Sequence, residues 1–270
     1  MKYINTNKIN QLEINKDNVC VVLDFDRTIT SEESTDSWDA SGRILGKEFK
    51  EEMQKYYEKY RPIELDYTMS EYNKERHMED WYSECMNLYY IYKLTKEKME
   101  KSIKESNLIF QKGAKEFIQK LIKLDIPTII LSAGIGNTIK QFLKENECLS
   151  ENIYIISNFI KFDNKGNMKK FDDNIIHSMN KTMKGKLPSK FRKLVKERKY
   201  RILVGDIIED IKMVEKKEWR NTLKIGFLNN KEENLEKYKI NFDIVLTKED
   251  ATFETIDKNI KYIVQSICKK

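Results

Sequence analysis

Short apolar runs alternate with amphipathic stretches along most of the chain. The apolar runs predict buried strands at residues 19–25, 127–132, 153–159, 200–204, 223–228 and 242–246. Apolar residues with helical spacing predict helices at residues 114–123, 138–145, 191–198, 211–217 and 232–238. Strands that alternate with helices predict an α/β fold, in which helices cover both faces of a doubly wound, mainly parallel sheet. Turn-forming residues at 163–166 also predict a hairpin near residues 159–171.

The stretch from residue 34 to residue 111 follows a different pattern. It has helical spacing and many long charged side chains, and nothing in it is typical of a strand. We predict a helical domain inserted after the first core strand, so that residues 1–33 and 112–270 form the core domain. Most aromatic residues of this insertion are expected to pack into its own small core, and one or two could stack on a ligand. Nine of the 14 tyrosines lie there: Tyr56, Tyr57, Tyr60, Tyr67, Tyr72, Tyr82, Tyr89, Tyr90 and Tyr92.

Composition narrows the class of partner. The 270 residues carry 50 Lys or Arg and 44 Asp or Glu, a net charge of +6 that suits an anionic substrate. The basic residues form no dense stripe, and those at 190–199 are expected to be a solvated helix face. Nucleic acid is therefore not a predicted partner. The four cysteines lie far apart, which is typical of reduced thiols in a cytoplasmic protein.

Targeting, membrane-spanning and zinc-binding patterns are not found in the sequence. Residues 1–18 are polar and lack the apolar segment of a signal peptide, and no apolar run is long enough to span a bilayer. His77 and His177 lie apart with no neighbouring ligand, so a zinc site is not expected. We expect a cytoplasmic protein with no membrane partner and no obligate protein partner.

Asp24 and Asp26 directly follow the apolar part of the first predicted strand. Side chains alternate along an extended segment, so both carboxylates can point to one spot. Paired carboxylates repel unless a cation or a proton neutralises them, which indicates a hard metal ion, acid–base chemistry or both. An EF-hand loop is excluded, because Ile29 and Thr35 stand where it needs glycine and glutamate. On these residues alone, a sugar-transferase Asp-x-Asp motif and a chance turn stay open.

Polar groups also follow two later strands. Ser132 precedes two small residues and a predicted helix, an arrangement that can bind an anion through the hydroxyl and backbone N–H groups. A dinucleotide-binding fingerprint fails there, because Ile139 occupies the third glycine position. Asp206 and Asp210 follow the strand predicted at residues 200–204, where a structural helix cap is the alternative interpretation. The pattern does not choose a functional lysine among Lys181, Lys184, Lys186 and Lys190.

These polar groups are expected to lie at one place. The carboxyl ends of parallel strands share one edge of the sheet, and ligands of such folds bind outside that edge. We therefore expect Asp24, Asp26, Ser132 and Asp206 to meet there. This coincidence favours a functional site over chance turns, and it predicts a site for a phosphate group.

With these motifs the chain resembles the haloacid dehalogenase (HAD) superfamily of phosphatases. The resemblance is carried by the segment Asp24-Phe25-Asp26-Arg27-Thr28, by Ser132, by a lysine, and by Asp206 with Asp210. More narrowly, the chain is similar to the pyrimidine 5′-nucleotidase type 1 (cytosolic 5′-nucleotidase III) family. That similarity covers nearly all of the chain beyond residue 19. It is carried by residues 62–66, 81–82, 132–136, 157–162, 176–177, 180–181, 223–229, 238 and 243–246.

The resemblance implies a fold, a reaction and a cofactor. It implies an HAD-like core with a C1-type helical cap, and Mg²⁺-dependent hydrolysis of a phosphomonoester, most simply a nucleoside monophosphate. Asp24 would form an aspartyl-phosphate, and Asp26 would protonate the leaving 5′-oxygen. Lys181 is the implied catalytic lysine, because it follows an asparagine in the family's Asn-Lys pair.

The resemblance also implies roles for the remaining site residues. Mg²⁺ would be held by Asp24, Asp206 and the backbone carbonyl of Asp26, while Asp210 would orient water on the metal or Lys181. The phosphoryl group would be bound by Ser132, Ala133, Gly134 and Lys181. The cap would contact the rest of the substrate through Glu64 and Cys85.

The chain departs from the family pattern at several positions. Arg27 replaces a methionine, and Ile207 and Glu209 interrupt a Gly-Asp-Ser-x-Gly-Asp run, which adds a carboxylate near the expected metal. Cys85 stands where the family has a substrate-binding serine, and a thiol is a poorer donor. Candidates for the aromatic residue that stacks on a base are Trp38, Tyr67 and Trp81. A phosphatase for a sugar phosphate or phosphoamino acid is therefore the alternative, and the intact motif set disfavours a non-catalytic binding protein.

Overall fold

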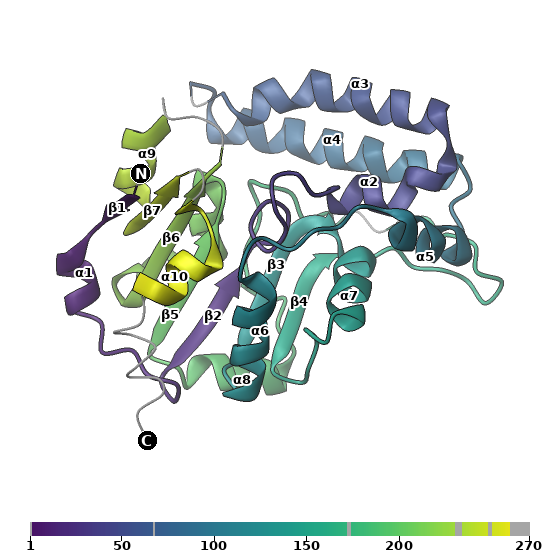
Figure 1. Cartoon of the computed structure of the whole chain (residues 1–270). Helices are drawn as coiled ribbons and strands as arrows, with labels where there is room; N and C mark the ends of the chain where they lie inside the picture. Colours follow the sequence, from purple (N-terminus) through teal and green to yellow (C-terminus); the bar gives the residue numbers. More distant parts are fainter. Residues whose placement is uncertain (1, 67, 172–173, 230–233, 248–249, 260–270) are drawn as a thin grey trace.

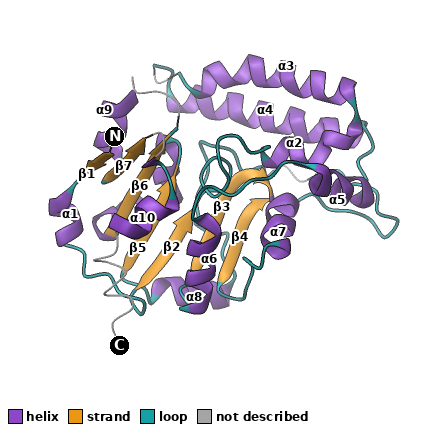
Figure 2. Cartoon of the chain, in the orientation of Figure 1, coloured by secondary structure: helices purple, strands orange, loops and turns teal. Residues whose placement is uncertain are grey.

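The computed structural model of the chain describes residues 2–66, 68–171, 174–229, 234–247 and 250–259. In these ranges, helices flank a seven-stranded sheet with the order β1-β7-β6-β5-β2-β3-β4 (Figures 1 and 2). Neighbouring strands are parallel except for β1, which is antiparallel to β7. The strands are β1 (Lys2–Ile4), β2 (Val19–Leu23), β3 (Thr128–Ile135), β4 (Ile153–Asn158), β5 (Tyr200–Gly205), β6 (Thr222–Leu228) and β7 (Ile244–Thr247).

The central strands β2 and β5 are buried along their whole length. Alternate side chains of β2 enter different hydrophobic cores. Val19, Val21 and Leu23 pack on one face of the sheet, and Cys20 and Val22 pack on the other. A continuous apolar run is what a strand needs when both faces of its sheet are covered, which is why these segments were recognisable in the sequence.

Helices cover both faces of the sheet. One face packs against α6 (Ala114–Lys123), α7 (Gly136–Glu145) and α10 (Phe253–Asn259). The other packs against α8 (Ser189–Lys196) and α9 (Leu235–Asn241). The prediction of an α/β fold with a doubly wound, mainly parallel sheet is confirmed. None of the helices in the described ranges combines the length and apolar composition that a bilayer span requires.

The segment between β2 and β3 is helical. In Figure 1, two long antiparallel helices of this segment lie side by side above the carboxyl ends of the strands. Its elements are α2 (Ser37–Gly42), the 3-10 helix η1 (Arg43–Leu45), α3 (Lys47–Glu64), α4 (Glu71–Ile91) and α5 (Lys96–Glu105). The division into a core and a cap at residues 34 and 111 stays a prediction.

This helical segment has a hydrophobic core of its own, which includes Phe49 and Met99 and also contacts Ile135 of β3. Two of the tyrosines expected to pack there, Tyr60 and Tyr89, are buried. By contrast, three others are largely exposed, namely Tyr57, Tyr72 and Tyr90. Tyr67 lies outside the described residues.

Some local predictions differ from the structure. The segment predicted as a helix at 211–217 forms two 3-10 helices, η2 (Ile208–Met213) and η3 (Lys216–Asn221). The predicted hairpin is reduced to one antiparallel bridge between Phe162 and Met168. The edge strand β1 and the short helix α1 (Thr6–Asn10) were not predicted. The helix expected at 232–238 begins outside the described residues, and α9 is assigned from Leu235.

Candidate active site

Three neighbouring strands bring polar side chains to one edge of the sheet. β2 lies between β3 and β5. Asp24 and Asp206 directly follow β2 and β5, whereas Ser132 lies within β3, three residues before that strand ends. All three line a cavity of about 970 Å³, whose opposite wall comes from α2, α3 and α4. The expected meeting of these strand ends is present in the structure.

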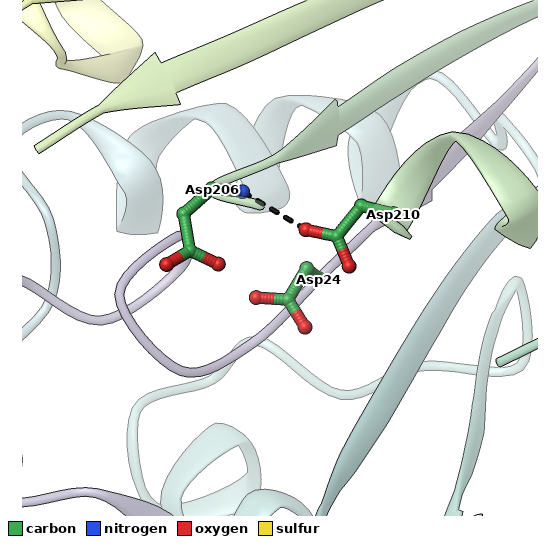
Figure 3. Close-up of side chains that lie close together, drawn as sticks. All are labelled: Asp24, Asp206 and Asp210. Carbon is green, nitrogen blue, oxygen red and sulfur yellow. Dashed lines mark hydrogen bonds between the residues drawn. The ribbon is translucent and has the colours of Figure 1, made fainter. Parts of the chain in front are cut away.

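Asp24 and Asp206, which line this cavity, form a compact acidic group with Asp210, which is buried behind them. Ligand oxygens of Asp24, Asp206 and Asp210 all lie within 4.8 Å of one another (Figure 3). Asp210 turns back toward the end of β5, where its Oδ2 accepts from the amides of Asp206 (2.9 Å) and Ile207 (3.2 Å). Gly205 makes room for this turn, because an added Cβ there would overlap the Asp210 carboxylate. An oxygen-only donor set with this much negative charge fits a hard cation such as Mg²⁺.

A buried lysine neutralises part of this charge. The Lys181 ammonium donates to Asp24 Oδ1 and, at 2.7 Å, to Asp210 Oδ1. Burial lowers the pKa of Lys181, but the two carboxylates outweigh it and hold that pKa above its usual value. Burial raises the pKa of Asp24 to about 6, although Lys181 opposes the shift. Because both oxygens of Asp210 are engaged, Asp24 and Asp206 are the carboxylates best placed to hold a cation.

Asp26 faces a different direction from the acidic group. Its Oδ1 accepts from the Ser37 amide at 2.8 Å, and its Oδ2 accepts from the Ser37 hydroxyl at 2.6 Å. Burial and the Asp36 carboxylate raise the pKa of Asp26 to about 7, while the bonds from Ser37 lower it. The Asp26 side chain is thus separate from the three aspartates, and a metal contact through its backbone carbonyl stays a prediction.

The carboxyl end of β3 is held by hydrogen bonds within the strand and from β4. The Gly134 amide donates to Ser132 Oγ at 2.9 Å, which leaves the hydroxyl hydrogen of Ser132 free to donate into the cavity. The carbonyls of Ala133 and Gly134 accept from Asn158 (2.9 Å) and Ser157 (2.7 Å). Ala133 and Gly134 line the cavity as expected for phosphoryl contacts, but in this structure the Gly134 N–H points to Ser132.

The wall contributed by the helical segment carries the other predicted substrate contacts. Glu64 is buried at the end of α3 and forms an ion pair with the Arg61 guanidinium. Cys85 is also buried, and burial raises the pKa of its thiol to about 12, so it is neutral. Trp38 and Trp81 both line the cavity. The third aromatic candidate, Tyr67, is outside the described residues.

Ion pairs connect α4 to the loop that carries Asp206 and Asp210. Lys74 lies 3.9 Å from Glu209, and Lys212 lies 3.0 Å from Glu71. Lys74 also donates to the backbone carbonyl of Glu64 at 3.1 Å. Glu209, expected from the sequence to add charge near the metal, therefore faces a lysine of the helical segment and is not part of the acidic group.

Sequence reasoning missed several residues of the site. Ser37 and Arg61 lie in a helical segment whose contacts with the sheet no local pattern reveals. Ser178 lines the cavity, and its buried hydroxyl has no hydrogen-bond partner among the described residues. The sequence carried a weak signal for Ser178, because it lies three residues before Lys181. Arg27 also lines the cavity, with a backbone φ of 62° in the left-handed region.

Sequence comparisons relate the chain to known 5′-nucleotidases. The sequence model of the family pyrimidine 5′-nucleotidase (UMPH-1) matches residues 30–267. A 7-methylguanosine phosphate-specific 5′-nucleotidase of Homo sapiens is 31% identical over 257 residues, which cover 92% of this chain and 85% of the relative. The enzyme of the same description from Drosophila melanogaster is 32% identical over 246 residues, covering 87% and 76%.

The fold is also similar to that of solved phosphatase structures. Cytosolic 5′-nucleotidase IIIB bound to cytidine superposes with a TM-score of 0.81 at 29% identity, and the match covers 96% of this chain and 91% of that one. A phosphoserine phosphatase, solved as an analogue of its phospho-aspartyl intermediate, superposes with a TM-score of 0.58 at 21% identity. That match covers 91% of this chain and 99% of the other and supports a shared HAD phosphatase fold.

Proposed function

The chain belongs to the pyrimidine 5′-nucleotidase (UMPH-1) family, and we propose that it hydrolyses nucleoside 5′-monophosphates with the help of Mg²⁺. One arrangement carries the proposal: at a single cavity an acidic group and a buried lysine lie together, and a further carboxyl stands apart from them. Such an arrangement supplies a nucleophile, groups that bind a phosphoryl oxygen, and a separate proton donor.

In the proposed reaction, a carboxylate oxygen of Asp24 attacks phosphorus and forms an aspartyl-phosphate, while the bond to the 5′-oxygen breaks. Asp26 gives its proton to that departing oxygen. It then takes a proton from the water that attacks the aspartyl-phosphate, which releases inorganic phosphate and restores Asp24. The Ser132 hydroxyl and the Lys181 ammonium bind the phosphoryl oxygens in line with the attack.

The residues present suit a divalent cation. Asp24 and Asp206 would hold Mg²⁺ together with the backbone carbonyl of Asp26, and Asp210 would keep Lys181 in place. When bound, Mg²⁺ would offset negative charge on these carboxylates and on the phosphoryl group. The burial of Asp24 makes such compensation important, because an isolated buried carboxylate is strongly destabilised.

We further propose that residues 34–111 form a cap over the leaving nucleoside. The cytidine bound to the neighbouring nucleotidase supports a nucleoside as the leaving group, and the polar and aromatic groups on the cavity wall opposite Asp24 support the position of the cap. Glu64 with its partner Arg61 could meet the polar edge of a base, and Trp38 or Trp81 could stack on it. Such a cover would exclude bulk water from the aspartyl-phosphate.

A phosphate-release screen tests the function. Cytidine, uridine, adenosine, guanosine and 7-methylguanosine monophosphates are compared with glucose 6-phosphate and phosphoserine, with added Mg²⁺ and with EDTA. We expect at least one nucleotide to exceed both other substrates by about tenfold in kcat/KM, a difference of about 1.4 kcal/mol, and EDTA to stop turnover. A preference for glucose 6-phosphate or phosphoserine would instead support the alternative of a metabolite phosphatase.

Two variants separate the chemistry from the fold. Asp24→Asn should abolish turnover of every substrate while thermal unfolding still shows a cooperative transition. Asp206→Asn should weaken Mg²⁺ binding, which calorimetry measures in the absence of substrate. Residual turnover in Asp24→Asn at the wild-type rate would remove the nucleophile assignment, and unchanged Mg²⁺ affinity in Asp206→Asn would remove the metal assignment.

A further inference from the structure

The carboxyl group of Asp26 is held by one residue that no motif identified. Both of its oxygens accept hydrogen bonds from Ser37, one from the amide and one from the hydroxyl. Two bonds from one residue fix the plane of the carboxyl group as well as its position. Each carboxyl oxygen keeps a second acceptor site, so a proton can still reside on Asp26 and be passed to a substrate.

We propose that Ser37 is a positioning residue that aims Asp26 at the leaving oxygen. The proposal rests on the proposed function, because it needs Asp26 to be the proton donor. Without the Ser37 hydroxyl, only the bond from the Ser37 amide remains, and the Asp26 carboxyl group could rotate about its own bonds toward water. Proton transfer requires the donor within hydrogen-bond distance of the departing atom, so a rotated carboxyl would transfer its proton poorly.

The hydroxyl of Ser37 is itself oriented by the end of β3. The amide of Ile135 donates to Ser37 Oγ at 3.2 Å, so the hydroxyl hydrogen remains for Asp26. Gly134 allows this close approach. A Cβ at position 134 would overlap Ser37 Oγ and lie only 2.7 Å from Asp26 Oδ2. Three separate segments of the chain therefore meet at one buried hydroxyl.

This junction links the proton donor to the helical segment over the cavity. Ser37 is the first residue of α2, and it is fully buried. Ser41, one turn later, donates to the Ser37 carbonyl at 2.8 Å and also bonds the hydroxyl of Thr138 on α7. The position of α2 on α7 thus determines where Ser37 holds Asp26. Asp26 is therefore oriented for proton transfer only when the helical segment is docked on the sheet.

The test compares two leaving groups. A nucleoside leaves as a basic alkoxide that needs the proton of Asp26, whereas p-nitrophenolate is a stable anion that needs little help. In Ser37→Ala, we expect kcat for the best nucleotide to fall by about 10- to 100-fold, a part of the typical contribution of general acid catalysis. KM should change little. With p-nitrophenyl phosphate, the initial burst of p-nitrophenolate reports only the formation of the aspartyl-phosphate. The rate of this burst should change by less than about threefold.

Control variants separate positioning from general damage. Ser102→Ala removes another buried hydroxyl of the helical segment, one that accepts from the Ile44 amide at 3.3 Å and does not bond Ser37 or Asp26, so it should slow both substrates to the same extent or neither. Ser37→Cys fills the site with a somewhat larger group that is only a weak donor, so it leaves no cavity and should still behave like Ser37→Ala in the comparison of leaving groups. Thermal unfolding of each variant shows whether it is folded.

The possible results separate the inference from the function on which it depends. Equal losses for both leaving groups in Ser37→Ala and Ser37→Cys, or no loss in either, would overturn the positioning role. If the wild type hydrolyses no nucleotide, the proposed substrate class fails. The same comparison is then made with the best alkyl phosphate of the screen, and a selective loss on that substrate would still support Ser37 as the residue that aims Asp26.

Discussion

Acid should destabilise this protein through one histidine near the active site. His177 is fully buried, and its Nδ1 accepts from the Met179 amide at 3.3 Å. Its Nε2 has no hydrogen-bond partner among the described residues. Burial, with a smaller effect of Lys186, lowers the pKa of His177 from 6.5 to about 4. The folded protein therefore holds this ring neutral at a pH where the unfolded chain would protonate it.

The sign and size of the effect follow from linkage. Between pH values near 6.5 and 4 the unfolded state binds the proton more tightly, so the free energy of unfolding falls as the pH falls through this window. With these two pKa values, lowering the pH from about 7.5 to about 5 removes about 2 kcal/mol of stability through this residue alone. Above the unfolded-state pKa the penalty disappears. The same turn leads to Lys181, so protonation of His177 would also disturb the lysine that we propose binds the phosphoryl group.

Urea unfolding at about pH 7.5 and about pH 5 measures this contribution. His177→Gln keeps an acceptor for the Met179 amide but does not titrate. We expect the variant to lose about 2 kcal/mol less than the wild type between the two pH values. His77→Gln removes the other histidine of the chain and serves as the matched control. Parallel losses in the wild type and His177→Gln would refute the reasoning, because other groups would then account for the acid sensitivity.

Two further substitutions probe the cavity. Gly134→Ala should lower kcat by at least about tenfold while the protein stays folded, because a Cβ there would displace Ser37 and Asp26. Gly46→Ala strains the backbone, because Gly46 has a φ of 101°, but its Cβ meets nothing within 4 Å, so this variant controls for loss of stability without a change in the cavity. Glu64→Ala should raise KM for nucleotides more than for p-nitrophenyl phosphate, since it leaves Arg61 unpaired beside the proposed site of the leaving group. Equal changes in both KM values would mean that Glu64 does not contact the nucleoside.

The sheet was predictable from the sequence because each of its central strands is buried on both faces. Such a strand is apolar at most positions: β2 is apolar throughout, and β5 departs only at Arg201, whose buried guanidinium is paired with Glu218. Once the strands are parallel, their carboxyl ends share an edge, so the meeting of Asp24, Ser132 and Asp206 follows from topology. β1 was not predictable in this way, because its three residues form an edge strand placed by pairing with β7.

The segment after Asp206 departs from the α-helix that its apolar spacing predicts. Residues 211–217 have helical spacing, yet the chain forms 3-10 helices there. The Asp210 carboxylate accepts from the amides of Asp206 and Ile207, which precede η2 and have no helical partner, so these bonds fix where the turn begins. Because the same carboxylate also holds Lys181, this local irregularity belongs to the site. A pattern of apolar residues contains no information about such a bond.

The contacts between the helical segment and the sheet could not be predicted from the sequence, for a different reason. Apolar spacing identifies which side of a helix is buried, but it does not specify which point of the sheet edge that helix meets. Ser37 contacts Asp26, and Arg61 lines the cavity, only because α2 and α3 dock as they do. Gly134 of β3 is the matching feature of the sheet. A glycine is required at this position only because a hydroxyl of the inserted segment lies against β3. The polar groups at the sheet edge could therefore be predicted from the strand segments alone. The orientation of Asp26, by contrast, depends on the sheet and the helical segment folding against each other.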